Sequence, residues 1–570
     1  MWLIVVLITF LSVAFYIHLR KKYNFWRDRR VPHLKPTYLL GNLGPTVFRI
    51  KSLRQVIEDV YTSFPKNRYV GFYNANEPVL ILRDPELIKD VTIKDFESFP
   101  DHRKFVPPNV DVLWEKNLFQ MNTEDGWHTM RSILSPSFSS SKMKQMFQLM
   151  EECVTQLVDH FKSQNEDISL EVQDVFTRIT NDIIATCAFG IQCNSLKNRD
   201  NEFYVMGREA SDFSGFKALK LVGHGISSTL MKLFNIKMFN SRVSSFFRKV
   251  INENLSLRKK NDVIRPDMIH LLLEASKRLG NLTEEERSKL IKTELTQEDI
   301  TAQALIFFFA GFDTVSSAMC YLCYELAINP EIQRQLYDEI RETVETSSQP
   351  TYESITSMKY LDCVISESLR LHSFAPVMDR QCQKSYVIKP VHPSEKPLHI
   401  QKGQLIWIPS YSIHRDEQYY LNPLKFDPER FNTENRSKIN WTMYLPFGVG
   451  PRMCIGSRFA LLELKLLIVE ILRNFEIVPN EKTEVPLSNS IASLNGLPDK
   501  AKRFLNMPNG PLPKIDLCRT LLKDVHFSSP SDRVVLETEK SLEDGLYAKS
   551  GRPPWSIIVA FDEEGPLDYY

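Results

Sequence analysis

One cysteine lies in a glycine-rich segment beside an arginine. The segment reads PFGVGPRMCIG from Pro446 to Gly456, and Arg452 precedes Cys454 by two residues. A thiolate is stabilised by nearby positive charge, and glycines let backbone N–H groups turn toward a sulfur without a side-chain clash. A helical pattern follows at once, so the sulfur precedes a helix N-terminus, where negative charge is favoured. The alternative, an inert buried thiol, is the usual fate of a free cysteine.

A second group of polar residues interrupts a long apolar run. The run from Thr296 to Pro330 opens with a capping-box pattern and ends at a proline, which predicts one helix of about 48 Å. Gly311, Asp313 and Thr314 lie in its middle, where glycine weakens a helix and a buried carboxylate needs a partner or a function. A satisfied core acid would explain Asp313 equally well from this helix alone.

The cysteine segment resembles the haem-binding signature F-x-x-G-x-R-x-C-x-G of the cytochrome P-450 family. Phe447, Gly450, Arg452, Cys454 and Gly456 occupy its specified positions. The resemblance implies that Cys454 is the axial ligand of a haem b iron, that Phe447 shields the iron–sulfur bond, and that Arg452 contacts a propionate. A thiolate ligand favours cleavage of the O–O bond.

Other segments match family motifs in the expected order. Trp127 and Arg131 match W-x-x-x-R, and with Arg380 they are expected to contact the haem propionates, since an arginine binds a carboxylate with two N–H groups. AGFDT matches the oxygen-activation segment: Ala310 and Gly311 would give room beside the haem.

In the same segment Asp313 and Thr314 are expected to act as the catalytic proton relay. Glu367, Arg370 and Arg430, from ESLR and PERF, are expected to form a structural cluster that holds the cysteine segment against the body.

The elements that position these residues are mainly helices with small β-sheets, which agrees with the cytochrome P-450 fold. A hairpin is predicted over Tyr69–Arg83, turning at Ala75-Asn76, and a strand over Leu405–His414. We expect a haem-binding mono-oxygenase domain over residues 46–480. Residues 481–570 carry no motif of the family; RVVLETE and SIIVAF in this tail are possible strands.

The N-terminus predicts a single-pass anchor. The anchor is expected over residues 1–19, which are apolar from Trp2 to Ile17 and are followed by RKK. The positive-inside rule then places the rest of the chain in the cytosol, on the endoplasmic reticulum membrane. Residues 20–45 form a basic, proline-rich hinge.

The composition restricts the partners. Lys+Arg 71 against Asp+Glu 70 shows no excess charge that would attract nucleic acid, and nine unevenly spaced cysteines signal no disulfide framework. The chain has no flavin or nicotinamide motif, so the resemblance implies electrons from an NADPH–cytochrome P-450 reductase, with cytochrome b5 as a second donor. Lys142, Lys144 and Arg452 are candidate docking residues.

The expected substrate is a small lipophilic molecule such as a xenobiotic, toxin, insecticide or endogenous lipophile, and the closest resemblance is to insect microsomal members. After Arg370 the chain reads LHSFAP, where these relatives carry paired prolines, so the shape of the pocket differs. Two alternatives stay open: a haem enzyme that rearranges hydroperoxides without reductase, and a non-catalytic haem-binding relative. Candidate pocket residues are Phe105, Val106, Phe308, Phe309, Ala310, Phe374 and Val377.

Overall fold

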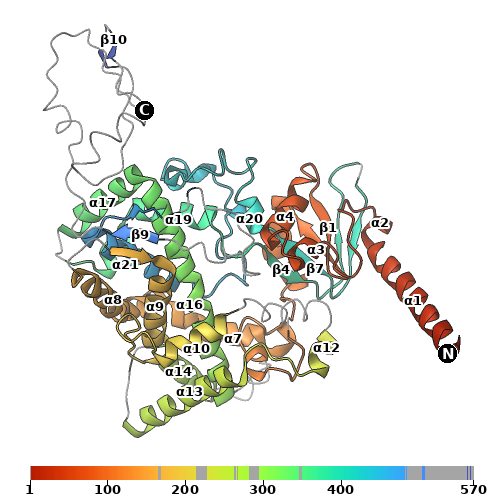
Figure 1. Ribbon diagram of the computed structural model, residues 1–570, viewed down its shortest axis with the longest axis horizontal. Coiled ribbons are helices and arrows are strands. Elements are labelled where there is room, and N and C mark those ends of the chain that lie inside the picture. Colours follow the sequence, from red (N-terminus) through yellow and green to blue (C-terminus); the bar gives the residue numbers. More distant parts are fainter. Residues whose placement is uncertain are drawn as a thin grey trace. The chain divides into compact units, whose positions relative to one another are not determined.

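Helices make up most of the fold, as the sequence predicts, in a computed structural model of the chain (Figure 1). The chain divides into a unit of residues 1–512 and a unit of residues 513–570. The structure describes residues 2–104, 106–164, 168–212, 228–261, 265, 267–280, 294–345, 349–393, 395–481, 483, 485, 504–507, 561–562 and 565–566. In the second unit, β10 (Phe561–Asp562) and β11 (Gly565–Pro566) pair antiparallel.

The described residues of the first unit form the α-helices α1 Trp2–Tyr23, α2 Phe25–Asp28, α3 Gly44–Val47, α4 Leu53–Thr62, α5 Pro85–Lys89, α6 Val112–Glu115, α7 Trp127–Leu134, α8 Ser140–Lys162, α9 Val172–Ile184, α10 Glu202–Ser211, α12 Ser228–Leu233, α13 Ser241–Asn261, α14 Met268–Gly280, α16 Gln297–Ile328, α17 Pro330–Glu345, α18 Tyr352–Ser357, α19 Lys359–Leu371, α20 Ser410–Ile413 and α21 Ser457–Asn474. The PERF segment forms a 3-10 turn, Pro428–Phe431.

Helix α16 is the predicted long helix, and it begins and ends where the sequence indicates. Thr296 caps it and exchanges hydrogen bonds with Asp299 in a capping box, and Pro330 starts the next helix. Helix α16 packs against α9, α10, α19 and α21 (Figure 1). Within the described residues it is also the one helix long and apolar enough to cross a membrane, but 67% of its apolar window is buried in the protein. Helix α16 is therefore a core helix.

A four-stranded sheet lies beside the helical core, in the order β1-β2-β7-β4. The predicted hairpin is confirmed as β1 (Tyr69–Asn74) and β2 (Glu77–Leu82), and Ala75 in its turn has φ 53°. Strand β2 runs parallel to β7 (Leu405–Ile408), and β7 runs antiparallel to β4 (Met378–Gln381).

Successive side chains of this sheet face two separate hydrophobic clusters. Val79 and Ile81 join one cluster, and Leu80 and Leu82 join the other, because successive residues of a strand point to opposite faces. The predicted strand over Leu405–His414 is right only for its first half. The chain turns into α20 after Pro409, a residue that cannot donate to a sheet. Strands β5 (Tyr386–Ile388) and β6 (Leu398–Ile400) pair separately.

One strand comes from the region where the sequence shows no family motif. Strand β9 (Phe504–Met507) lies between β3 (Ile168–Glu171) and β8 (Val478–Pro479) and pairs antiparallel with both. The first unit thus contains sheet residues beyond position 480. Of the two predicted tail strands, RVVLETE lies outside the described residues, and Phe561 of SIIVAF belongs to β10.

The described side chains of helix α1 are mostly apolar and exposed, and the predicted membrane anchor stays a prediction. Trp2 and Leu3 at its start are more than four-fifths exposed, whereas Leu19 and Tyr23 at its end pack into the core beside the four-stranded sheet. Its last turn carries Arg20, Lys21 and Lys22.

Candidate active site

The cysteine segment forms a loop whose shape depends on two glycines. Gly448 and Gly450 have φ values of 77° and 76°, a region that side chains disfavour. A Cβ atom on Gly450 would lie 2.0 Å from the carbonyl oxygen of Thr92. The loop closes where the Cys454 N–H donates to the Phe447 carbonyl, at 2.9 Å. The backbone at Phe447 therefore sets where Cys454 lies.

Cys454 differs from the other described cysteines. All eight described cysteines are free, and seven are buried while Cys454 is exposed. Surrounding protein nevertheless raises the pKa of this thiol by desolvation, while the Gly456 N–H and the charge of Arg131 lower it. A side chain that is both accessible and surrounded by protein lies in a recess. Helix α21 begins at Ser457, so the predicted position before a helix N-terminus is confirmed.

Two arginines beside this recess have no carboxylate partner in the described part of the chain. Burial lowers the pKa of Arg131, and the nearby Cys454 raises it. Arg380 is 2% exposed, and burial lowers its pKa to about 10. Arg380 donates to the carbonyl oxygens of Asp379 and Val449, at 2.8 and 3.2 Å, while its Nε atom is buried without a partner. The charge of Asp379 partly compensates the buried Arg380, and Arg131 is half-buried. Neither guanidinium forms an ion pair with a carboxylate in the described residues, so both suit binding of a further anionic group.

Arg452 is bound by the protein through every nitrogen of its side chain. Nε donates to the Pro100 carbonyl at 2.6 Å and Nη1 to the Met121 carbonyl at 3.0 Å. Nη2 lies 3.3 Å from the Asp101 carboxylate. The predicted propionate contact of Arg452 stays a prediction, and these partners show a structural role for its charge.

Arg452 does not belong to a docking surface, because its side chain is only 2% exposed. That part of the docking prediction is wrong. Lys144 is exposed and forms an ion pair with the exposed Glu353.

Sequence reasoning missed the acids and the histidine that surround the arginines. Asp379 binds His102 Nδ1 at 2.9 Å and the Arg103 N–H at 2.7 Å. Burial raises the pKa of Asp379, but His102 and these hydrogen bonds outweigh it and lower the pKa to about 2. Asp101 accepts from the N–H and the hydroxyl of Thr123. Asp101 is adjacent to no motif residue, and the position of Asp379 beside Arg380 is the one signal in the sequence.

The middle of α16 is its accessible part. Ala310 is exposed although most of the helix is buried, and Asp313 and Thr314 are half-buried. The Thr314 hydroxyl donates to the Ala310 carbonyl at 2.6 Å. Burial raises the pKa of Asp313 to about 6. An acid with a pKa near neutrality can both give and take a proton under working conditions.

Gly311 has a packing role, and the room that it is expected to give beside the haem stays a prediction. A Cβ atom there would lie 3.1 Å from Cδ1 of Ile184, so the missing side chain lets α16 approach α9. The hydroxyl of Thr180 in α9 donates to the Phe312 carbonyl at 2.8 Å.

The predicted cluster of Glu367, Arg370 and Arg430 is confirmed. Arg370 binds the Glu367 carboxylate at 2.7 Å with both side chains fully buried, and Arg430 binds its other oxygen at 3.2 Å. Backbone carbonyls take the remaining donors of both arginines, among them that of Pro423. The cluster ties α19 to the PERF turn.

The candidate pocket residues divide between the core and accessible positions. Phe308 and Val106 are buried core residues, so their prediction as pocket residues is wrong. Ala310 is exposed, Phe309, Phe374 and Val377 are half-buried, and Phe105 lies outside the described residues. The rings around Phe308 are Phe189, Phe203, Phe247 and Phe312.

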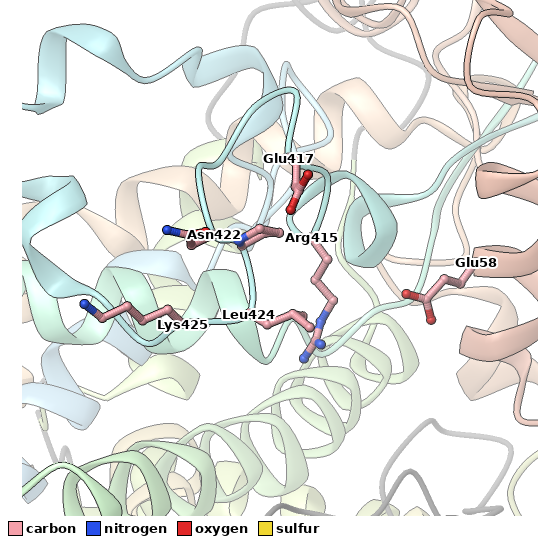
Figure 2. Close-up of a pocket in the computed structure, with 7 residues that line it drawn as sticks. Glu58, Arg415, Glu417, Asn422, Leu424 and Lys425 are labelled. Atoms are coloured by element: carbon pink, nitrogen blue, oxygen red, sulfur yellow. The ribbon is translucent and has the colours of Figure 1, made fainter.

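A separate groove of about 420 Å³ contains none of these residues (Figure 2). It is lined mainly by charged and polar side chains of α4 and of the loop after α20. The lining residues are Glu58, Arg415, Glu417, Asn422, Pro423, Leu424 and Lys425.

Comparison with known proteins agrees with this geometry. Residues 32–502 match the family model of Cytochrome P450. Cytochrome P450 9e2 of Blattella germanica is 42% identical over 85% of this chain and 94% of its own length. Probable cytochrome P450 9f2 of Drosophila melanogaster is 36% identical over 85% and 95%, and Cytochrome P450 6k1 of Blattella germanica is 34% identical over 86% and 95%. A match over most of the chain, together with an accessible cysteine beside unpaired arginines, leads to one conclusion: the chain belongs to the cytochrome P450 family of haem-iron mono-oxygenases.

Proposed function

We propose that this enzyme oxidises small lipophilic substrates, inserting one atom of dioxygen and reducing the other to water. Two electrons and two protons balance the reaction for each hydroxylated product. The observation that carries the proposal is Cys454, which is accessible, lies before α21, and receives the Gly456 N–H and the charge of Arg131. Haem b bound through this thiolate would supply the chemistry of dioxygen cleavage, and coordination deprotonates a thiol outright.

The charges beside Cys454 fit haem b, which carries two propionate groups. Arg131 and Arg380 form no ion pair with a carboxylate within the described residues, and Arg380 has an orphaned buried Nε atom. We assign the propionates to these two arginines and to Trp127. Arg452 supports the same region through Asp101 and two backbone carbonyls.

Asp313 and Thr314 are assigned to the supply of protons. The Thr314 hydroxyl donates its hydrogen bond to the Ala310 carbonyl, so the Thr314 oxygen can still accept a hydrogen bond. Asp313 holds its proton up to about pH 6 because of burial. Asp313 is therefore the proton donor of the pair. Thr314 orients the group that receives the proton from Asp313. The exposed Ala310 beside them gives the substrate an apolar contact.

Electrons come from a separate NADPH–cytochrome P-450 reductase or from cytochrome b5, with Lys142 and Lys144 among the docking residues. Association with the endoplasmic reticulum membrane rests on α1, whose exposed apolar side chains are followed by three basic residues. Phe48 and Ile50, each more than three-fifths exposed, add to the apolar surface of the N-terminal region. The catalytic domain then faces the cytosol.

The test is the absorption spectrum of the reduced protein with carbon monoxide. A thiolate-ligated haem gives a red-shifted Soret band, and Cys454→Ala removes it. An unshifted band in the wild-type protein would refute the assignment of Cys454. Product formed from lipid hydroperoxide alone, without NADPH and reductase, would instead indicate peroxide rearrangement. No consumption of dioxygen with reductase across a broad panel of lipophiles would indicate a binding protein.

A further inference from the structure

A histidine outside all the motifs connects the Glu367–Arg370–Arg430 cluster to the cysteine loop. His414 follows α20 and is fully buried. Its backbone carbonyl accepts a hydrogen bond from Arg370 Nη1. Its ring Nε2 accepts from the backbone N–H of Leu445, at 2.8 Å. One residue therefore touches both the cluster and the first residues of the loop.

Leu445 determines where the cysteine loop starts. The Leu445 carbonyl accepts from the Gly448 N–H at 3.2 Å, and the Phe447 carbonyl accepts from the Cys454 N–H at 2.9 Å. Beyond the contact of Leu445 with the His414 ring, these two backbone hydrogen bonds lead to the N–H of Cys454. A shift of the Leu445 backbone therefore moves the Phe447 carbonyl, which accepts the hydrogen bond from the Cys454 N–H.

The ring of His414 is held in the form that accepts at Nε2. Because Leu445 donates a backbone N–H, the ring proton is on Nδ1, which is buried without a partner in the described residues. The surroundings are the charges of Arg370 and Arg415 and the rings of Tyr420 and Tyr444. Burial, followed by the Arg370 charge, lowers the pKa of His414 to about 3. The ring stays neutral across the physiological range.

The loop after α20, which contains His414, also lines the groove of Figure 2. Arg415, the next residue, lines this groove, and Pro423 and Lys425 line it as well. The carbonyl of Pro423 accepts from Arg370 at 2.8 Å. The loop after α20 therefore both lines the charged groove and contacts Arg370.

We propose that His414 is a positioning residue for the haem-ligating thiolate: its Nε2 atom fixes Leu445 and through it the geometry of the Cys454 loop. The inference rests on the proposed role of Cys454. A buried N–H that loses its acceptor carries the full cost of its desolvation. Without Nε2 the Leu445 N–H has to find another acceptor, and the loop leaves the position that presents the sulfur.

The experiment compares variants that keep or remove the acceptor in the haem-loaded protein. His414→Gln places an amide oxygen near the position of Nε2, whereas His414→Leu fills similar volume without an acceptor. Tyr420→Phe is the matched control, because it removes a buried hydrogen bond to the neighbouring Met443 carbonyl and leaves Leu445 untouched. The readout is the fraction of bound haem with the red-shifted carbon monoxide band, measured beside total haem and the midpoint of thermal unfolding.

We expect His414→Leu to lose the shifted band several-fold relative to His414→Gln, with Tyr420→Phe close to wild type. Equal fractions in the Leu and Gln variants would overturn the inference. If His414→Leu does not fold, His414→Asn replaces it, because its shorter amide does not reach Leu445; an Asn variant as thiolate-ligated as the Gln variant also overturns it. A wild-type protein without the shifted band refutes the role of Cys454 and this inference together.

Discussion

The guanidinium carbon of Arg452 lies 3.8 Å from the centre of the Trp127 ring. A cation above an indole contributes about 0.5–2 kcal/mol, more as the pair is desolvated, and here both side chains are nearly buried. The contact joins the cysteine loop to the first residue of α7. Trp127 and Arg452 thus belong to separate motifs but form one contact between the cysteine loop and α7. Substitutions of the arginines near Cys454 can test which of them support the fold.

We predict that substitution of Arg452 lowers the stability of the fold, whereas substitution of Arg131 weakens the binding of haem. Arg452→Gln leaves the fully buried Asp101 carboxylate without its cation and lowers the free energy of unfolding by about 3–5 kcal/mol. Arg131→Gln changes that free energy by about 0.5 kcal/mol or less and instead speeds the loss of haem. Urea unfolding and the rate of haem transfer to apomyoglobin measure the two effects. If the two variants lose haem at the same rate and have the same free energy of unfolding, the two arginines do not have these separate roles.

The second prediction concerns two glycines of the same loop. Gly450→Ala forces a Cβ atom to 2.0 Å from the Thr92 carbonyl at a φ of 76°, so we expect little folded, haem-loaded protein. Gly456→Ala is the control, since its φ is −86° and its nearest neighbour would be Phe138 at 3.9 Å. Haem content per folded chain measures both. A tolerated Gly450→Ala would show that the loop has a different shape.

The third prediction is a pH dependence set by Asp313. Its pKa is raised from 3.8 to about 6, so the proton it donates is lost as the pH rises through about 6. We expect the product formed per dioxygen consumed to fall over that range. Asp313→Asn cannot donate an acidic proton, so it forms product at least about 100-fold more slowly, with no slope near pH 6. A wild-type profile as flat as that of the variant would remove Asp313 from the relay.

The same shift affects stability with a definite sign. Between pH 3.8 and about 6 the folded protein holds the Asp313 proton and the unfolded chain releases it. The free energy of unfolding therefore decreases as the pH rises through this window. Asp313→Asn removes that contribution, which urea unfolding at several pH values detects.

The fourth prediction separates β9 from the rest of the tail. A chain ending at Leu512 keeps β9 and the whole first unit, so we expect normal haem content and thermal stability. A chain ending at Lys500 loses β9 and its pairing with β3 and β8, at about 1 kcal/mol for each ladder hydrogen bond. Its unfolding midpoint falls. If both truncations unfold like the full chain, β9 contributes nothing to the fold.

Local patterns in the sequence predicted the elements that depend on neighbouring residues. Thr296, Asp299 and Pro330 mark the ends of α16 because caps and prolines act within one turn. The turn at Ala75 follows in the same way from the residues around it. The Glu367–Arg370 pair is one helical turn apart, and its motif supplied Arg430.

Features that depend on distant backbone could not be predicted. The partners of Arg452 are carbonyl groups of loops at Pro100 and Met121, and a carbonyl has no signature in a sequence. Phe308 was assigned to the wrong surroundings because α16 is apolar on most faces, so no periodicity distinguishes the side facing other helices. The clash that requires Gly450 comes from Thr92, far away in the chain.

The order of strands β3-β9-β8 has a consequence for how the chain is made. The middle strand, β9, is the last of the three to be synthesised. Strand β3 therefore lacks its pairing partner during most of the synthesis of the first unit. Contacts between distant segments form slowly, and unpaired edges expose a growing chain to aggregation. Translation that stops between residues 480 and 503 therefore yields a chain that has the described helices and the cysteine loop but lacks the middle strand of this sheet.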